Sequence, residues 1–382
     1  MKRILIFGST GSVGLNALDV VRKNKKYFRV EGLCTYENID KLCRQIKEFS
    51  PSCVCVVNEK KAGALKKKIG TRIRIFRGAE GLEEFSRLTG DISLMAISGI
   101  AALAPLMINL KYAKRVALAN KEAVITAGKF IFEAAAKFNT EIIPVDSEIN
   151  AFFQLFTETR RSFARVYLTA SGGPLLGYTK RQLSGIGVAQ ALSHPTWKMG
   201  SRITIDSATL VNKGFEAIET HRFFGVGYDN IRIVIHRESI VHGLVEFDDH
   251  TIFSCMYPTD MRIPISFALF YPERHGGNKA LDFERNFGLS FRPINIAAYP
   301  LLELILAAAK RGDNSLVILN ACDETAIKYF LEEKIKFTAI HGAMRHIFDI
   351  YPAQKIKNLG DIFYWDKWAR EKTKEYLAKG KG

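Results

Sequence analysis

Short apolar runs alternate with longer segments of helical periodicity over the first 150 residues. The apolar runs predict strands at Arg3–Phe7, Arg29–Cys34, Cys53–Val57, Arg72–Phe76, Ile92–Ile97, Arg115–Ala119 and Glu141–Val145. The periodic segments between them predict helices that include Gly14–Asn24, Ile39–Phe49, Leu82–Leu88 and Lys121–Phe138. Strands that alternate with helices are typical of a parallel sheet covered by helices, so residues 1–150 are predicted to form an α/β domain.

The pattern changes after residue 150. Strands without a helix strictly between them are predicted at Arg165–Ala170, Ile231–Ile235, Ile240–Phe247 and Thr251–Met256, and the last two form a hairpin around Asp248–His250. These strands indicate an α+β domain over residues 151–276, with an antiparallel or mixed sheet.

The C-terminal part has only helical periodicity. Helices are predicted at Ala298–Arg311, Asn320–Glu333, Thr338–Phe348 and Trp365–Ala378, with Asn320 and Thr338 as N-caps. Residues 277–295 are predicted to be a linker, and residues 296–382 a helical bundle that serves as scaffold or interface.

Composition narrows the class of protein. The chain has 382 residues, of which 47% are hydrophobic and 25% are charged, and no apolar run is long enough to cross a membrane. A strand that begins at Arg3 leaves no room for a targeting peptide, so a cytoplasmic location is expected. The six cysteines form no spaced zinc pattern and are interpreted as reduced thiols.

The net charge of +16 suggests an anionic ligand. The basic clusters, such as Lys66–Lys68 and Lys372–Lys381, are scattered and are not interleaved with aromatic residues. This distribution favours a phosphorylated small molecule and cofactor over a nucleic acid or a membrane.

The first predicted turn carries Gly8, Gly11 and Gly14 between a strand and a helix. This context, with Thr10 and Ser12 as further donors, is typical of a dinucleotide pyrophosphate at a helix N-terminus and predicts a Rossmann-like domain. At the end of the second strand, Glu37 disfavours the additional phosphate of NADPH on charge, unless it points away and Asn38 only caps the next helix. The choice between NADH and NADPH stays open at this point.

Two acidic pairs are candidate metal ligands. Asp146 and Glu148 are two apart and are expected on one side of a strand end, while Glu216 and Glu219 are three apart on one helix face. Such carboxylates suit a hard divalent cation, although either pair alone is more often solvated. The neighbouring motifs favour a metal site over solvated carboxylates.

Further polar residues lie in predicted loops and helix starts. Lys121, after Asn120, either belongs to a helix cap or polarises a carbonyl oxygen. A phosphate cradle is predicted from residues that singly would serve as caps or turn formers, namely Ser171, Ser207, Asn212 and Lys213. His194 is either a substrate donor or a structural histidine, and the loop that carries Trp197 and Met199 is either a lid or part of the core.

Several stretches together resemble the 1-deoxy-D-xylulose 5-phosphate reductoisomerase family of the non-mevalonate isoprenoid pathway. They occur in order along nearly the whole chain and are GSTGSVG from Gly8, LANKEAV from Leu118, PVDSE from Pro144, ASGGP from Ala170, HPTWKMG from His194, DSATLVNKGFEAIE from Asp206 and PTDMRIPISFALFYP from Pro258. The resemblance implies a metal-dependent rearrangement of 1-deoxy-D-xylulose 5-phosphate and its reduction by NADPH to 2-C-methyl-D-erythritol 4-phosphate. It also implies a homodimer.

The resemblance assigns roles by matching position. The implied Mg²⁺ or Mn²⁺ ligands are Asp146, Glu148 and Glu216. The implied catalytic residues are Lys121, Glu148 and His194, and the implied substrate contacts are Lys121, Ser147, Glu148, Ser171, His194, Ser207, Asn212, Lys213 and Glu216. The implied NADPH contacts are Thr10, Gly11, Ser12, Val13, Asn38, Asn120, Glu122 and Gly200, and Trp197 and Met199 match a mobile lid.

Three stretches depart from the family pattern. Tyr36 and Glu37 stand where a glycine and a basic residue are usual, Ala102 replaces a customary glycine, and Arg237–Glu238 replaces a Pro–Gln pair. Two other functions remain as alternatives: an NAD(P)-dependent dehydrogenase of the semialdehyde or homoserine type, which needs no acidic triad, and a nucleotide-sensing or nucleic-acid-binding regulator. Metal dependence and salt-dependent binding to duplex DNA discriminate among them.

Overall fold

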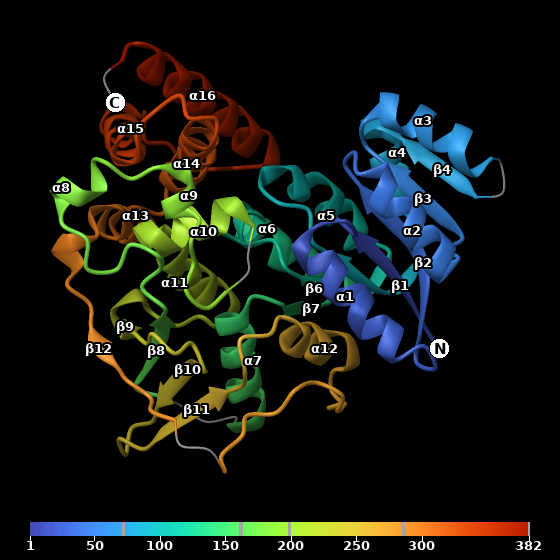
Figure 1. The fold of residues 1–382 in the computed structure, drawn as a ribbon, viewed down its shortest axis with the longest axis horizontal. Coiled ribbons are helices and arrows are strands. Elements are labelled where there is room, and N and C mark those ends of the chain that lie inside the picture. Colours follow the sequence, from blue (N-terminus) through green and yellow to red (C-terminus); the bar gives the residue numbers. More distant parts are fainter. Residues whose placement is uncertain (71–72, 160–162, 198–199, 285–286, 381–382) are drawn as a thin grey trace. The chain divides into compact units, whose positions relative to one another are not determined.

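The computed structural model describes residues 1–70, 73–159, 163–197, 200–284 and 287–380. The chain divides into two compact units (Figure 1). The first comprises Met1–Ala123, Lys129–Phe153 and Asp260–Lys279, and the second Val124–Gly128, Gln154–Thr259 and Ala280–Gly382. The division into three domains with boundaries at 150, 276 and 295 stays a prediction.

The first unit contains a seven-stranded sheet in the order β4-β3-β2-β1-β5-β6-β7, in which every neighbouring pair is parallel. Its strands are β1 Lys2–Phe7, β2 Phe28–Thr35, β3 Cys53–Val56, β4 Arg74–Arg77, β5 Gly90–Met95, β6 Ala113–Leu118 and β7 Glu141–Pro144. The strand order reverses direction between β1 and β5, which is the switch point beside which sheets of this kind bind ligands at the carboxyl ends of their strands. The predicted α/β domain with a parallel, Rossmann-like sheet is confirmed.

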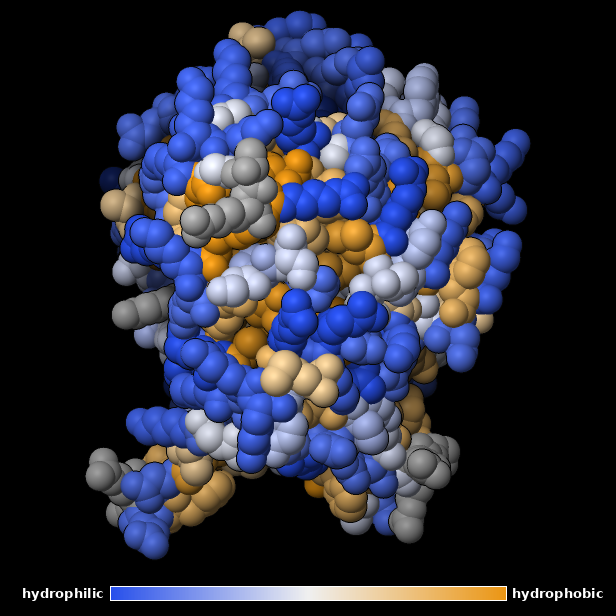
Figure 2. All heavy atoms as spheres, turned by 90° about the vertical axis from the view of Figure 1, so that its right-hand side faces the viewer, coloured by the Kyte–Doolittle hydropathy of each residue, from blue (hydrophilic) through white to orange (hydrophobic). Residues whose placement is uncertain are grey.

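Helices follow the strands of this sheet: α1 Ser12–Lys23, α2 Ile39–Phe49, α3 Glu59–Ile69, α4 Gly78–Ser86, the 3₁₀ turn η1 Ile100–Ala102, α5 Leu103–Asn109, α6 Lys121–Phe138 and α7 Ser147–Thr159. Asn38 and Asn120 cap α2 and α6 through their side chains, as the sequence predicts. The lysines Lys66–Lys68 are exposed on α3. Hydrophilic residues likewise cover much of the face shown in Figure 2.

Helix α12, Arg262–Phe270, joins the first unit although it follows the second sheet in the chain. Ile265, Ala268 and Leu269 are fully buried in the same apolar core as Ile4 and Leu18. Arg262 forms ion pairs with Asp260 at 2.6 Å and with Asp19 of α1 at 3.1 Å. Residues 260–279 therefore belong to the core that supports the β1–α1 turn.

The second unit contains a five-stranded sheet in the order β11-β10-β8-β9-β12. Its strands are β8 Arg165–Ala170, β9 Ile231–Ile235, β10 Val241–Glu246, β11 Ile252–Met256 and β12 Arg292–Pro293. β8 and β9 are parallel and the other pairs are antiparallel, so the sheet is mixed and the predicted β10–β11 hairpin is confirmed. The edge strand β12 lies within the stretch interpreted as a linker.

Helices complete the second unit: α8 Lys180–Leu183, α9 Val188–Ala191, α10 Ser201–Thr209, α11 Val211–Phe224, the 3₁₀ turns η2 Tyr228–Asn230 and η3 Ile296–Ala298, α13 Pro300–Arg311, α14 Ser315–Leu331, α15 Phe337–Ile350 and α16 Leu359–Ala378. Two predicted N-caps are wrong. α14 begins after Asn314, so Asn320 lies inside the helix, and α15 begins after Lys336 rather than at Thr338.

The fold class is thus confirmed: a Rossmann-like parallel sheet, an α+β region with a mixed sheet, and C-terminal helices. In the part of the chain that the structure describes, no helix combines the length and the apolar character needed to cross a bilayer. All six cysteines are free thiols.

Candidate active site

The glycine turn between β1 and α1 packs so closely on neighbouring backbone that Gly8 and Gly14 leave no room for a side chain. Gly8 has φ +84°, and a Cβ there would lie 2.4 Å from the carbonyl oxygen of Ala96. A Cβ on Gly14 would lie 2.3 Å from the carbonyl oxygen of Gly8. Gly11 is the N-cap of α1 and provides no side-chain cap, which leaves the first backbone amides of α1 suited to an anion.

The end of β2 lies beside this turn, because β1 and β2 are adjacent strands. Thr10 Oγ1 and Thr35 Oγ1 are 2.6 Å apart, and Lys41 Nζ donates to the carbonyl oxygen of Thr10 at 3.4 Å. Glu37 is exposed and accepts a hydrogen bond from Asn58 Nδ2 at 3.3 Å. Glu37 therefore points towards the next turn, and Lys41 supplies a cation beside the glycine turn.

Asn120 connects the ends of β5 and β6. Its Nδ2 donates to the carbonyl oxygens of Ile97 at 2.8 Å and Gly99 at 3.0 Å and to Glu122 at 2.9 Å, while its Oδ1 accepts from the Ala123 amide at 2.7 Å. The backbone amide of Gly99 donates to Glu122 at 3.2 Å. Asn120 and Glu122 thus fix the loops at the carboxyl edge of the sheet. The adjacent Lys121 forms an ion pair with Asp146.

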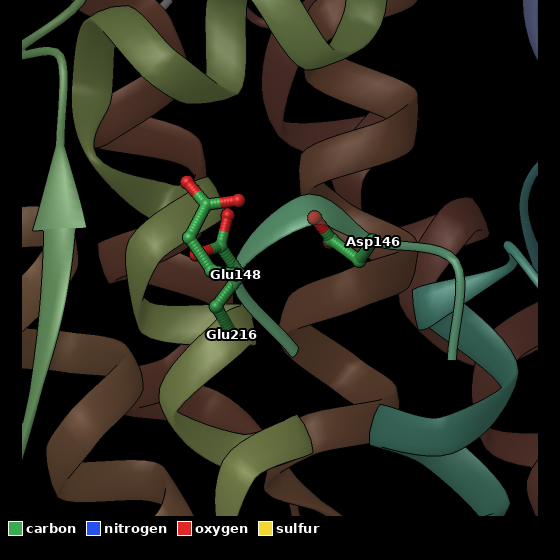
Figure 3. Close-up of side chains that lie close together, drawn as sticks. All are labelled: Asp146, Glu148 and Glu216. Carbon is green, nitrogen blue, oxygen red and sulfur yellow. The ribbon is translucent and has the colours of Figure 1, made fainter. Parts of the chain in front are cut away.

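Three carboxylates form a group that can hold a metal ion: Asp146, Glu148 and Glu216 each offer an oxygen, and these oxygens lie within 4.8 Å of one another (Figure 3). Asp146 and Glu148 are half-buried and Glu216 is buried. Glu219 is not a member of the group.

The prediction that Asp146 and Glu148 share one side of a strand end is wrong. β7 ends at Pro144, and α7 begins at Ser147, so Glu148 lies in the first turn of a helix and not on a strand. Ser147 Oγ donates a hydrogen bond to Glu148. A tight strand-to-helix turn, rather than the alternation of a strand, brings the two carboxylates to one side.

Glu216 is fully buried in α11, and its charge is balanced locally. Its Oε1 accepts from Asn212 Nδ2 and its Oε2 from Lys213 Nζ, each at 2.5 Å. Burial of a carboxylate is unfavourable unless it is paired and hydrogen-bonded, and both conditions hold here. Two residues predicted as phosphate ligands therefore also position Glu216.

Ser171 and His194 are in direct contact, with Ser171 Oγ 3.1 Å from His194 Nε2. His194 Nδ1 accepts from the amides of Thr196 at 3.2 Å and Trp197 at 3.0 Å, so the neutral ring carries its proton on Nε2. Burial, aided by the charge of Arg237, lowers the pKa of His194 to about 4. His194 is therefore a neutral donor near pH 7.

Ser171 opens a tight turn that packs against α10. Gly173 has φ +66°, and a Cβ there would lie 2.5 Å from the carbonyl oxygen of Ser207. The Gly173 amide donates to Ser171 Oγ at 3.2 Å. The turn thus places Ser171 beside the helix that carries Ser207, as a shared phosphate site requires.

The predicted lid is only partly described. Trp197 is half-buried, and its ring lies 6.0 Å from the His242 ring in an edge-to-face arrangement. Gly200 is exposed and is the N-cap of α10. Met199 lies outside the described residues.

Comparison with known proteins decides the family. Three family models match: 1-deoxy-D-xylulose 5-phosphate reductoisomerase over residues 4–128, its C-terminal domain over residues 142–224, and DXP reductoisomerase C-terminal domain over residues 256–372. The reductoisomerase of Thermoanaerobacter pseudethanolicus is 39% identical over 99% of this chain and all of its own length. The chain belongs to the 1-deoxy-D-xylulose 5-phosphate reductoisomerase family.

Other reductoisomerases agree. That of a Sulfurihydrogenibium species is 43% identical over 95% of both chains. A reductoisomerase crystallised with NADPH, fosmidomycin and magnesium superposes with a TM-score of 0.94 at 32% identity, over 100% of this chain and 99% of its own. The Zymomonas mobilis reductoisomerase in complex with NADPH gives 0.91 at 30% identity, over 98% of this chain and 99% of its own.

Membership of the reductoisomerase family confirms the predicted family and the predicted class of enzyme, an oxidoreductase. Two residues near the site were not singled out by the sequence: Lys41 and Arg237. Arg237 was noted only as a departure from the family, and Lys41 belongs to an ordinary amphipathic helix. Both reach the site through hydrogen bonds to backbone carbonyl oxygens, which leave no sequence signal.

Proposed function

We propose that the chain rearranges 1-deoxy-D-xylulose 5-phosphate with the help of a divalent metal and reduces the product with NADPH to 2-C-methyl-D-erythritol 4-phosphate. This is the reaction expected in non-mevalonate isoprenoid biosynthesis. The observation that carries the proposal is the convergence of three carboxylates in a chain of this family.

Asp146, Glu148 and Glu216 are proposed to hold Mg²⁺ or Mn²⁺. Their oxygens are the hard ligands that these ions prefer, and their closeness fits a single ion. When bound, the ion supplies Lewis acidity and a template for two substrate oxygens. Lys121, paired with Asp146, is proposed to stabilise negative charge on a substrate oxygen, and Ser147 is proposed as a further donor to substrate.

The second unit is proposed to bind the phosphate. Ser171, Ser207, Asn212 and Lys213 provide hydroxyl, amide and ammonium donors, and the Ser171 turn packs directly on the Ser207 backbone. His194 is proposed to donate a hydrogen bond from Nε2–H to a substrate oxygen, since its Nδ1 accepts from backbone amides and its lowered pKa keeps the ring neutral.

The first unit is proposed to bind NADPH, which supplies a hydride. The amides of Ser12 and Val13 at the start of α1, which no side chain caps, suit the pyrophosphate, and Thr10 and Gly11 are proposed to contact it beside them. Asn38, Asn120 and Glu122 lie at the ends of β2 and β6 on the same sheet edge and are proposed to contact the rest of the cofactor, as is Gly200.

The test is oxidation of NADPH by the purified chain with 1-deoxy-D-xylulose 5-phosphate and Mg²⁺, followed by identification of the product. We expect turnover that chelation abolishes and that Mg²⁺ or Mn²⁺ restores. Absence of turnover with both NADPH and NADH would contradict the proposal.

The metal site is tested by Asp146→Asn, which should lower kcat by about a hundredfold or more because one anionic ligand is lost. Asp40→Asn changes an exposed carboxylate and serves as the control. Isothermal titration with Mn²⁺ should show weaker binding to Asp146→Asn alone. Near-normal kcat in this variant would remove Asp146 from the site.

A homodimer is also proposed on the family resemblance, and a cytoplasmic location is kept as the proposal that the sequence analysis made. Light scattering of the purified chain tests the first, and fractionation of the source cells tests the second.

A further inference from the structure

Arg237 lies just after β9 and binds the turn that carries Ser171. Its Nη1 donates to the carbonyl oxygens of Ser171 at 3.2 Å and Gly173 at 2.9 Å. These two hydrogen bonds tie the turn after β8 to the end of β9.

The turn is fixed from two sides. Gly172 and Gly173 have φ of +79° and +66°, a conformation that other residues rarely adopt. On one side, Gly173 packs against the Ser207 backbone with no room for a Cβ. On the other side, Arg237 holds the two carbonyl oxygens, so that the turn presents Ser171 Oγ and its amides in one arrangement.

The charge of Arg237 acts on this turn. Among the described residues, no acidic side chain forms an ion pair with Arg237, and the neighbouring Glu238 accepts a hydrogen bond from Ser290 Oγ at 2.7 Å. The guanidinium helps to lower the pKa of His194, after burial, which shows that its field reaches the side chain in contact with Ser171. An anion bound at Ser171 would experience the same field.

We propose that Arg237 is a positioning residue for the substrate phosphate: it preorganises the Ser171–Gly173 turn through two backbone hydrogen bonds and adds positive potential to the phosphate pocket. The proposal rests on the proposed function, since it assigns the phosphate to Ser171 and Ser207. Arg237 is exposed, so its contribution is screened by solvent and is expected to be moderate.

The test compares Arg237→Met and Arg237→Lys with Arg232→Met. Arg232 is a matched control, because it is an exposed arginine on β9 that also donates to a backbone carbonyl oxygen, that of Asp229 at 2.6 Å. Arg237→Met should raise the KM for the phosphorylated ketose by about three- to tenfold. Its kcat and its KM for NADPH should stay near those of the wild type, and inorganic phosphate should inhibit it more weakly by the same factor.

Arg237→Lys separates charge from geometry. Lysine keeps the charge but lacks the planar fork, so an intermediate rise in KM is expected. Nuclear magnetic resonance titration of the histidine rings should show a higher pKa of His194 in Arg237→Met, and little change in Arg237→Lys or Arg232→Met. If Arg237 had only a structural role, the pKa of His194 would not depend on whether the side chain at position 237 is charged.

The outcomes separate this inference from the proposed function. If the wild-type chain does not turn over the substrate, the proposed function fails. If the wild type is active and Arg237→Met equals Arg232→Met in its KM, in its inhibition by phosphate and in the His194 titration, only the role of Arg237 is refuted.

Discussion

At the scale of single residues, each proposed metal ligand is already held by a neighbouring side chain. Asp146 pairs with Lys121, Glu148 accepts from Ser147, and Glu216 binds Asn212 and Lys213. These partners limit the rotamers of the carboxylates and balance their charge before any ligand arrives. Preorganisation of this kind lowers the free energy needed to assemble the site.

Cofactor preference is also decided by single residues. Glu37 is exposed and bound to Asn58, whereas Lys41 Nζ lies against the glycine turn. We predict that Lys41→Ala weakens NADPH binding by about three- to fivefold and NADH binding less, because one favourable surface charge is lost. Glu37→Ala should change NADPH binding less, because Glu37 points towards the next turn. Titration calorimetry with each cofactor measures both effects.

Lys47→Ala is the control for this prediction, since Lys47 is exposed in the last turn of the same helix. It should bind both cofactors like the wild type. Equal losses for NADPH and NADH in Lys41→Ala would contradict a role in recognising the added phosphate.

The types of the site residues were predictable from the sequence, but several of their contacts were not. Acidic residues two and three apart predicted a metal site. Asp146, Glu148 and Glu216 do lie together, but Glu148 lies on a helix and not on the expected strand. Asn212 and Lys213 were assigned to phosphate, and the structure shows that they also hold Glu216. The spacing of two residues predicts whether they share a face only if the type of secondary structure is predicted correctly. The sequence did not indicate that a helix begins at Ser147.

At the scale of elements, the start of α1 depends on the close packing of the glycine turn. We predict that Gly14→Ala shifts this turn, because a Cβ there would lie 2.3 Å from the carbonyl oxygen of Gly8. Weaker NADPH binding by about tenfold or more is expected, since the amides of α1 are then displaced. Calorimetric titration of the cofactor measures the change.

Gly63→Ala is the matched control, because Gly63 lies inside α3 and nothing lies within 4 Å of its Cβ position. Alanine should stabilise this helix slightly and leave cofactor binding unchanged. Wild-type affinity for NADPH in Gly14→Ala would show that the turn tolerates the shift.

A buried ionic network joins three helices of the second unit. Arg202 of α10 pairs with Asp323 at 3.2 Å and Glu324 at 2.7 Å on α14, and Arg370 of α16 pairs with Asp366 at 2.7 Å and also with Glu324. Burial raises the pKa of Asp323 to about 6, although Arg202 opposes the shift. The network thus contains a carboxyl group that titrates at mildly acidic pH.

The sign of its effect on stability follows from linkage. Asp323 holds its proton more tightly when folded, so it contributes stability that is complete below its ordinary pKa of 3.8 and is lost as pH rises through about 6. We predict that the excess unfolding free energy of the wild type over Asp323→Asn shrinks across this range, by at most about 3 kcal/mol. Urea titrations at several pH values measure it.

Asp229→Asn provides a control of opposite sign, because Lys310 lowers the pKa of the exposed Asp229. Its contribution should be present above its ordinary pKa of 3.8 and be lost as pH falls. A difference between the wild type and Asp323→Asn that grows with pH would refute the assignment.

The elements themselves were largely predictable, and their partners were less so. Apolar runs and helical periods located the strands of both sheets except β12, because burial imposes these periods directly. The return of α12 to the first core and the pairing of β12 with β9 escaped the sequence, since both depend on partners far away in the chain. α14 was predicted to start too late, because Asn320 resembles a cap although it lies inside the helix, where it binds Arg202.

At the scale of the whole molecule, the dominant feature is the formal charge of +16 on 382 residues. A positive field attracts anions from solution and raises their rate of encounter. Both the proposed substrate and the proposed cofactor are anionic. We therefore expect the net charge to assist the proposed function, with a small contribution from exposed lysines such as Lys66–Lys68.

If the positive field assists substrate capture, added salt should lower kcat/KM. The Debye length is about 10 Å at 0.1 M salt and about 30 Å at 0.01 M, so salt removes long-range attraction while it leaves buried contacts nearly intact. We expect kcat/KM for the phosphorylated ketose to fall several-fold between about 0.02 and 0.3 M sodium chloride, at saturating Mg²⁺ and NADPH. The kcat should change little, because the bound substrate is no longer exposed to the screened field.

Two controls accompany the salt series. Sucrose at matched osmolality controls for solvent effects. Exchange of Lys66–Lys68 for glutamine, which removes exposed charges outside the proposed site, should reduce the salt dependence of kcat/KM only slightly. A kcat/KM that is independent of salt would mean that the excess charge does not assist substrate capture.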